Sequence, residues 1–268
     1  MSRKKLVVSG DSWTAGTKRD KNGQPCVYPE PENNTKWLNG LIAQNINPEF
    51  KLWPEYLGDM LDMDVVNVGL GGVGNEFIYN NIVDKLSSVK NVGLTIAMWS
   101  EHTRWDFIRK RTLRIDPSVE DPFEGWLSQP LINHLKPIVD VIKSRNMTTT
   151  EYNFLRSLRW FNAFQNYCES NKIPYMQCSA FNTTSNDIVS QIIDHPVFYK
   201  MKEDHFYGWP IFHQIGGFNM SDKLNEIDPD MTKFRVSDED THPNTEGHKF
   251  IAELLYSNYV NNEVYDGT

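Results

Sequence analysis

The sequence predicts an α/β fold of three layers, in which a mainly parallel sheet of four or five strands lies between helices. Two observations predict it. Short apolar runs rich in β-branched residues alternate along the chain with longer stretches in which apolar residues recur at helical spacing. One run, residues 92–99, is nearly continuous apolar sequence, as expected for a strand buried on both faces. Because nothing in the chain resembles a flexible linker, we expect a single domain over residues 1–268.

The expected elements follow one another in a regular order. Strands are predicted at residues 6–8, 64–68, 92–99 and 174–179. Helices are predicted just after residue 12 and at residues 53–61, 76–86, 132–142, 149–171 and 249–256. Asn75 is expected to cap the helix that follows it. Residues 18–48 and 181–231 show no sustained period, and we expect them to be insertions into the α/β framework.

Composition and charge exclude several classes of protein. Hydrophobic residues make up 39% of the chain and charged residues 23%, which is ordinary for a globular protein. The net charge of −8 argues against general binding of nucleic acid, which depends on clustered Lys and Arg. The chain has no run of about 18 apolar residues, and residues 2–5 lead directly into a strand. We therefore expect a cytoplasmic protein that does not bind membranes.

The cysteines give no sign of a disulfide framework. The three of them, Cys26, Cys168 and Cys178, are odd in number and lack the spacing of metal ligands. A reducing compartment fits this usage, and Cys178 is expected to be a small core residue.

Ser12 is the candidate nucleophile. The strand at residues 6–8 leads into Gly10, which permits an unusual backbone angle, and Ser12 then stands where a helix can begin. A hydroxyl at that place meets unpaired backbone N–H groups, which favour negative charge developing nearby. The alternative is that Ser12 only caps the helix.

His242 is the candidate base, near the other end of the chain. It follows three acidic residues, of which Asp240 or Glu239 could orient the imidazole. Pro243 stiffens the chain after it, and a helix follows. Nearer the middle, Arg104 is expected to pair with Asp106 or with the acidic residues before His242, or else to hold an anionic group of a substrate.

These residues resemble the sequence blocks of the SGNH (GDSL-type) hydrolases. Gly-Asp-Ser at residues 10–12 resembles the family's first block, and residues 65–72 resemble its second, with Gly72 at the oxyanion position. The third block differs, because Ser100 stands where the family has asparagine. The last block differs too, because Asp240 lies two residues before His242, where the family has three. The resemblance implies a flavodoxin-like fold, a catalytic triad of Ser12, Asp240 and His242, and an oxyanion hole formed by Ser12, Gly72 and Ser100.

The expected activity is hydrolysis of an ester, in a small molecule or a carbohydrate, through an acyl-enzyme and without cofactor or metal. Four alternatives stay open. The altered blocks also fit a non-catalytic binding or structural component of a larger assembly. An O-acetyltransferase would use the same triad. Finally, residues 69–74 fit a dinucleotide-binding glycine pattern, and Asp238, Asp240 and His242 alternate as metal ligands can.

Overall fold

The computed structural model describes residues 2–15, 51–106, 129–181, 188–236 and 240–262, and these residues form an α/β fold. The strands are β1 (Lys5–Ser9), β2 (Asp64–Asn67), β3 (Val92–Trp99), β4 (Tyr175–Ser179) and β5 (Phe206–Tyr207). The α-helices are α1 (Ser12–Ala15), α3 (Trp53–Met60), α4 (Asn75–Leu86), α5 (Gln129–Ser144), α6 (Thr150–Ser170), α7 (Val189–Ile192), α8 (Met220–Ile227) and α9 (Thr245–Asn261). Short 3-10 helices lie at Phe198–Lys200, Glu203–His205 and His213–Ile215.

The sheet confirms the predicted fold class. Within the described residues it has five strands in the order β2-β1-β3-β4-β5, and every neighbouring pair is parallel. This is the strand order of flavodoxin-like folds. In such sheets ligands bind at the carboxyl ends of the strands, next to the place where the chain reverses its direction of winding. Here that place lies between β1 and β3, so the ends of these two strands are where a site is expected.

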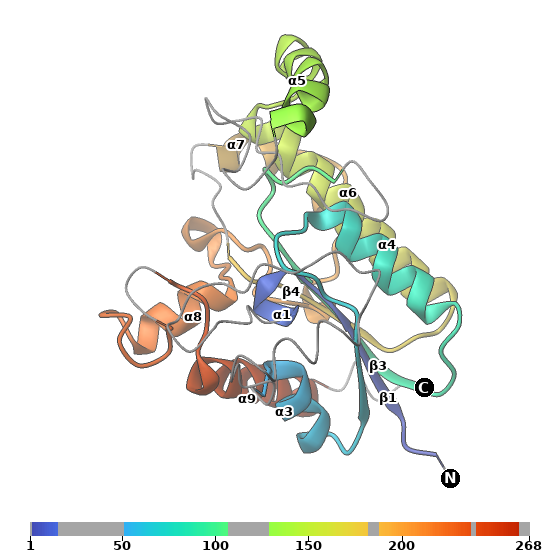
Figure 1. The fold of residues 1–268 in the computed structure, drawn as a ribbon. Coiled ribbons are helices and arrows are strands. Elements are labelled where there is room, and N and C mark those ends of the chain that lie inside the picture. Colours follow the sequence, from blue (N-terminus) through green and yellow to red (C-terminus); the bar gives the residue numbers. More distant parts are fainter. Residues whose placement is uncertain (1, 16–50, 107–128, 182–187, 237–239, 263–268) are drawn as a thin grey trace.

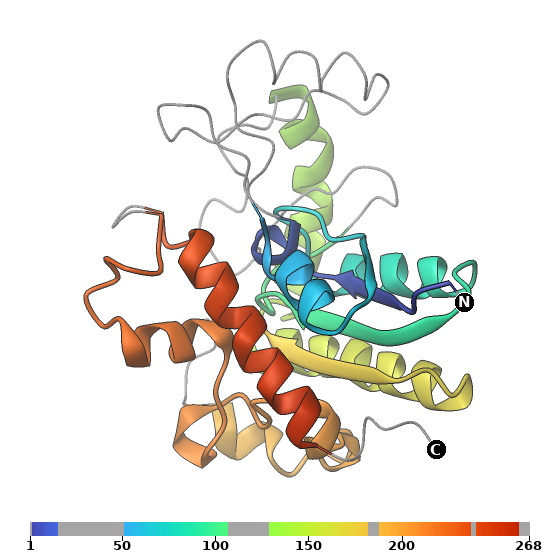
Figure 2. The same cartoon turned by 90° about the horizontal axis from the view of Figure 1, so that it is seen from below.

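Helices cover both faces of the sheet, as the alternating side chains of the strands require. Val7 and Ala97 face a core shared with α4 and α6. Leu6, Val8 and Ile96 face the opposite core, shared with α3, α8 and α9. Figure 1 shows α4 and α6 side by side on one side of the strands and α3 and α9 on the other, and Figure 2 shows α9 crossing that second face. The result is the predicted sandwich of three layers.

Of the two regions expected to be insertions, the structure describes only part of one. Residues 18–48 lie outside the described residues. Of residues 181–231, the described part contributes β5 at the edge of the sheet and α8, which packs against α9. Whether this region is an insertion stays a prediction, as does the single domain over residues 1–268.

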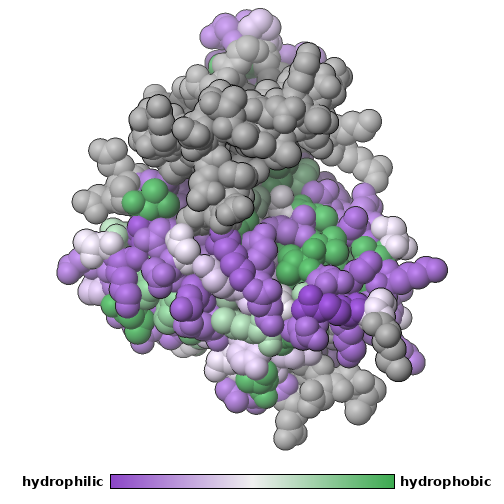
Figure 3. Space-filling view, turned by 60° about the horizontal axis from the view of Figure 1, so that its bottom comes forward, coloured by the Kyte–Doolittle hydropathy of each residue, from purple (hydrophilic) through white to green (hydrophobic). Residues whose placement is uncertain are grey.

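In the described stretches, none of the helices is both long enough and apolar enough to cross a bilayer. The face drawn in Figure 3 is largely hydrophilic, with hydrophobic side chains in groups between hydrophilic areas. Large exposed apolar side chains such as Ile138, Tyr199 and Val260 come from different elements of the fold. Single exposed residues of this kind are usual for globular proteins.

Candidate active site

Ser12 lies directly beyond the carboxyl end of β1, at the start of α1. The turn is held by Asp11, whose main-chain oxygen accepts hydrogen bonds from the N–H groups of Thr14 and Ala15. Its carboxylate accepts another from the N–H of Trp13, with a distance of 3.0 Å. Asp11 therefore caps the helix, and the Ser12 side chain stays available for other contacts.

Glycine is needed at residue 10 because the turn has no room for a side chain there. A Cβ atom on Gly10 would lie 2.1 Å from the Thr14 hydroxyl and 3.0 Å from the main-chain oxygen of Met98. Gly10 is not among the glycines with positive φ, so space and not backbone angle is what requires glycine here. A larger residue here would push the Ser12 turn away from β3.

Ser12, His242 and Asp240 form a chain of hydrogen bonds. The Ser12 hydroxyl oxygen lies 2.7 Å from Nε2 of His242, although 230 positions separate the two residues in the sequence. On the other side of the ring, Nδ1 of His242 lies 2.6 Å from Oδ1 of Asp240. The same carboxylate oxygen accepts the main-chain N–H of His242 at 3.2 Å. Glu239, the other candidate for orienting the imidazole, lies outside the described residues.

The Asp240 and His242 side chains differ in their exposure to water. The Asp240 side chain is 10% exposed and that of His242 is 31% exposed. A carboxylate held so close to a half-buried imidazole fixes the tautomer that has its proton on Nδ1 and stabilises the ring when it becomes charged. Nε2, which lies 2.7 Å from the Ser12 hydroxyl, is then the ring nitrogen that can accept the serine's proton.

The segment that carries His242 is anchored on both sides. The main-chain oxygen of His242 accepts a hydrogen bond from the N–H of Val236, and Pro243 forms a β-bridge with Arg235. After it, the Asn244 side chain caps α9 by accepting the N–H of Gly247 at 3.0 Å. Asn244 therefore fixes the start of the helix that follows His242.

The glycine turn after β2 runs beside Ser12. The N–H of Leu70 donates to the main-chain oxygen of Gly10, at 3.0 Å. The side chain of Asn67 donates to the main-chain oxygen of Thr14, at 2.8 Å. Gly72 has a φ of +78°, a conformation that favours glycine, and nothing lies within 4 Å of the place where its Cβ would be. The turn thus brings a glycine-rich stretch of backbone to the same edge of the sheet as Ser12.

Ser100 lies behind this turn and is fully buried. Its hydroxyl donates to Oδ2 of Asp11 at 2.8 Å. The same oxygen accepts a second hydrogen bond from Nη1 of Arg104, at 2.9 Å, and Nε of Arg104 lies 2.5 Å from Glu101. The tips of neighbouring parallel strands thus place Arg104 against Asp11 and Glu101, which the sequence did not suggest as its partners. Its guanidinium is 7% exposed and is occupied by these two carboxylates. Burial raises the pKa of Asp106, an expected partner, and the charge of Arg104 acts on that pKa in the opposite direction. Residues 238 and 239, the other acidic residues expected to pair with Arg104, lie outside the described residues.

Asn75 belongs to the site's framework, which the sequence did not reveal. Gly74 occupies the N-cap position of α4, so the prediction that Asn75 caps this helix was wrong. The buried Asn75 amide accepts the main-chain N–H of Ser100 at 2.8 Å and donates to its main-chain oxygen at 3.2 Å. It also donates to the Ser157 hydroxyl at 3.0 Å. Asn75 thereby joins the loop after β3 to α4 and α6. No local motif signals this role, which depends on contacts between distant segments.

Two buried histidines near the site are held neutral. Burial lowers the pKa of His248 from 6.5 to about 3, and the nearby charge of His242 lowers it further. Burial also lowers the pKa of His102 to about 3, with a smaller effect from Arg156. Neither ring is protonated at neutral pH, so His248 does not compete with His242 for a proton.

The described residues offer little for a metal ion. Among them, no group of three or more His, Cys, Asp or Glu side chains gathers closely enough to hold one. Asp238, which the sequence suggested as a partner of Asp240 and His242 in such a site, lies outside the described residues.

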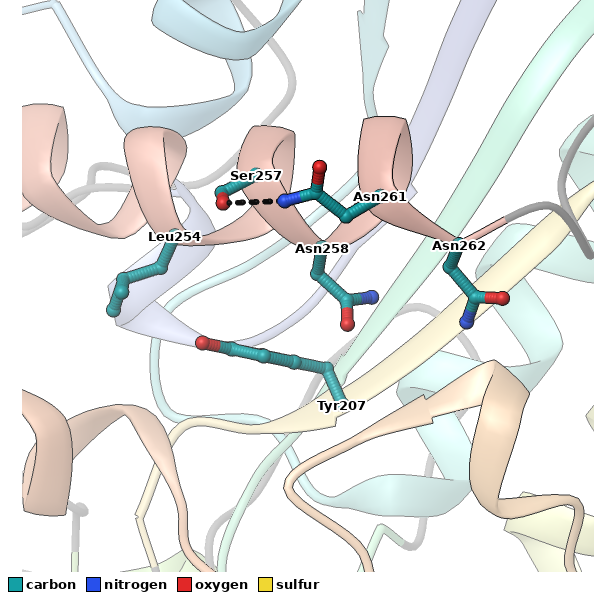
Figure 4. Close-up of a pocket in the computed structure, with 6 residues that line it drawn as sticks. All are labelled: Tyr207, Leu254, Ser257, Asn258, Asn261 and Asn262. Atoms are coloured by element: carbon teal, nitrogen blue, oxygen red, sulfur yellow. Dashed lines mark hydrogen bonds between the residues drawn. The ribbon is translucent and has the colours of Figure 1, made fainter.

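A separate cavity of about 410 Å³ lies along the C-terminal half of α9. It is lined by Tyr207, Leu254, Ser257, Asn258, Asn261 and Asn262. Figure 4 shows the Tyr207 ring beneath the helix, with Asn258 directed toward it. The amides already bond within the fold: Asn261 donates to Ser257, and Asn262 donates to the main-chain oxygen of Asp204. His242 precedes the opposite end of α9, so this cavity is separate from the candidate site.

No family model and no curated protein matches the chain. Several solved structures do. A protein from Desulfitobacterium hafniense DCB-2, assigned as a lipolytic protein of the G-D-S-L family, is 16% identical, with 95% of this chain and 98% of that chain covered and a TM-score of 0.44.

Two carbohydrate esterases are similar to a comparable degree. A carbohydrate acetylesterase family member from Sinorhizobium meliloti is 14% identical, with 98% of this chain and 99% of that chain covered and a TM-score of 0.41. A carbohydrate esterase family 2 enzyme with a carbohydrate-binding domain, from Corynascus thermopiles, is 12% identical, with 100% and 68% covered and a TM-score of 0.46. These identities and TM-scores are low, so the chemistry of the site has to be judged from this chain's own residues.

Proposed function

We propose that the protein is a serine-dependent ester hydrolase that acts through an acyl-enzyme. One observation carries this proposal. The Ser12 hydroxyl, the His242 imidazole and the Asp240 carboxylate follow one another at 2.7 Å and 2.6 Å, at the carboxyl edge of a parallel sheet. A nucleophile, a base and a group that orients the base, all within hydrogen-bonding distance, are what acyl transfer by serine requires.

In the first half of the reaction, Nε2 of His242 takes the proton of Ser12 while the serine oxygen bonds to the carbonyl carbon of the ester. The carbonyl oxygen becomes an oxyanion. When this intermediate collapses, the bond between carbon and the alcohol oxygen breaks, and His242 gives its proton to the leaving alcohol. In the second half, His242 takes a proton from water as the water oxygen bonds to the acyl carbon. The bond between that carbon and Oγ of Ser12 then breaks, the carboxylic acid leaves, and His242 returns its proton to Ser12. Asp240 stabilises the charged imidazole in both halves.

Backbone N–H groups are the best candidates for stabilising the oxyanion. Ser12 begins α1, and Gly72 lies in the glycine turn that runs beside it, so we assign the donors to the N–H groups of these two residues. The Ser100 hydroxyl donates to Asp11 and therefore supports the turn from behind. Losing one oxyanion donor typically slows an enzyme by a factor of about 10² to 10³. With Ser100 engaged in this way, we expect slow turnover on generic esters.

The substrate class is an ester of a small molecule or of a carbohydrate. A panel of short-chain esters and acetylated sugars separates these two, and addition of an acceptor sugar to the same assay tests for acetyl transfer. Turnover that rises with the acceptor, and yields the acetylated acceptor in place of acetate, would favour an O-acetyltransferase.

The test of catalysis compares initial rates of the wild type with those of Ser12→Ala and His242→Ala, at equal concentrations of folded protein. The matched control is Ser9→Ala, because Ser9 is a fully buried serine three residues upstream on β1. We expect both site variants to lose activity by about 10⁴-fold or more, and the control to keep it. A folded wild type that hydrolyses nothing in the panel would contradict the proposal and favour a binding or structural role.

A further inference from the structure

Arg235 is a buried cation that reaches the segment carrying His242. Its side chain is 3% exposed. Nη1 donates to the main-chain oxygen of Thr241 at 3.0 Å. Nη2 donates to Oγ of Ser221 at 3.0 Å and to Oδ1 of Asn225 at 2.8 Å, both on α8. One guanidinium therefore ties the residue before His242 to a neighbouring helix.

The same guanidinium also lies over the ring of Trp13. Its central carbon is 4.9 Å from the ring centroid, within the range of a cation–π contact. Trp13 directly follows Ser12, and Thr241 directly precedes His242. Arg235 is thus in contact with the chain neighbour of each member of the 2.7 Å pair of Ser12 and His242.

The guanidinium of Arg235 is better explained by the direction of its hydrogen bonds than by its charge. Burial removes the guanidinium from water and lowers the pKa of Arg235 from 12.5 to about 10, against the opposing effect of Asp228. The group remains charged at neutral pH, and the hydrogen bonds given above go to neutral oxygens. Apolar residues of similar volume often stabilise a fold as well as buried charges do. The planar, multidentate guanidinium offers what they cannot, which is a fixed direction for several hydrogen bonds at once.

We propose that Arg235 is a positioning residue that keeps His242 over Ser12 by clamping Thr241 and Trp13 together. This inference rests on the proposed function, since it concerns the geometry of the same reaction. Small displacements of a reacting group are expensive: a misplacement of 1 Å can slow a reaction by about 10²-fold. Without the clamp, the segment of His242 keeps its bridge to residue 235 but loses its fixed distance from α1.

The experiment measures kcat, KM and thermal unfolding for Arg235→Met and Arg235→Lys. Methionine keeps much of the apolar packing and removes every hydrogen bond, whereas lysine keeps the charge and can restore one of them. The matched control is Gln165→Met. Gln165 is a buried side chain on α6, on the opposite face of the sheet, and it holds a loop by donating to the main-chain oxygen of Lys200 and accepting the N–H of Lys202.

We expect Arg235→Met to lower kcat by about 10²-fold with KM nearly unchanged, and Arg235→Lys to recover part of that loss. Gln165→Met should lose thermal stability without loss of kcat. A purely structural role would give Arg235→Met the same profile as Gln165→Met, and this result would overturn the inference. If Arg235→Met does not fold, Arg235→Lys decides: a wild-type kcat in that variant contradicts the clamp.

The wild type separates this inference from the proposed function. If the wild type is active and the Arg235 variants keep its kcat, only the clamp is refuted. A folded but inactive wild type refutes the proposed function, and the role of Arg235 with it.

Discussion

Acidification should destabilise this protein through two buried histidines, and His102 allows the effect to be isolated. Burial lowers the pKa of His102 and of His248 from 6.5 to about 3 in the folded state. Below pH 6.5 the unfolded chain therefore binds protons that the folded chain does not, so stability is fully present above this pH and falls as the pH drops toward 3.

The size of the effect follows from the shift. Between pH 7.5 and pH 5.5 each histidine should remove on the order of 1 kcal/mol from the free energy of unfolding, and the two together roughly twice as much. His102→Phe keeps an aromatic ring beside Phe154 and Phe161 but removes one titrating group. We expect the free energy of unfolding of this variant to fall by about 1 kcal/mol less than that of the wild type over the same range.

The assay is urea unfolding, followed by circular dichroism, of both proteins at the two pH values. The comparison stops at pH 5.5 because carboxyl groups begin to titrate below it. Equal losses of stability in the wild type and in His102→Phe would refute the reasoning, since they would mean that His102 is not held neutral by burial.

Three further predictions concern the site and its support. Asp240→Asn should lower kcat by about 10³- to 10⁴-fold, because the imidazole loses the group that fixes its tautomer; steady-state kinetics check this, and a loss below tenfold would speak against it. Asn75→Ala should destabilise the fold by about 1–3 kcal/mol in urea unfolding, because the main-chain groups of Ser100 lose their buried partner; unchanged stability would contradict it. Arg104→Met should lower the free energy of unfolding by about 3–5 kcal/mol, because it leaves Asp11 buried without its cation. Adding Asp11→Asn should recover part of this loss. Strictly additive losses of stability in the double variant would exclude the pairing.

The secondary structure could be predicted closely wherever one face or both faces of an element are buried. The strand expected at residues 92–99 is β3 with the same bounds, because a strand buried on both faces reads as a continuous apolar run. The long helix expected at residues 149–171 is α6, Thr150–Ser170, whose apolar stripe packs against the sheet. Helix α9 is longer than expected at both ends, since it runs from Thr245 to Asn261 and its first and last turns are rich in polar residues.

The nucleophile and the base of the site could be predicted from the sequence, but the carboxylate that orients the base could not. Spacing and resemblance pointed to Ser12 and His242, and the structure brings the two side chains together. Sequence alone left Asp240 and Glu239 open, because both lie close to His242 in the chain and only the path of the backbone decides which carboxylate reaches Nδ1.

The supporting contacts could not be predicted at all. Asp11 and Arg104 are 93 positions apart, and their pairing follows from the parallel neighbourhood of β1 and β3. The clamp formed by Arg235 joins Thr241 to Trp13, two residues that are far apart in the sequence and meet only in the folded chain. Such contacts leave no periodic pattern in the sequence, because each one involves single residues that lie far apart in the chain.

In the proposed mechanism, His242 activates Ser12 as a nucleophile. Treatment with a fluorophosphonate, followed by mass spectrometry of the digested protein, detects this activation. We expect one phosphonate adduct, on the peptide that contains Ser12, absent from Ser12→Ala and formed far more slowly in His242→Ala. An unmodified Ser12 in folded wild-type protein, or an adduct that persists in Ser12→Ala, would contradict it.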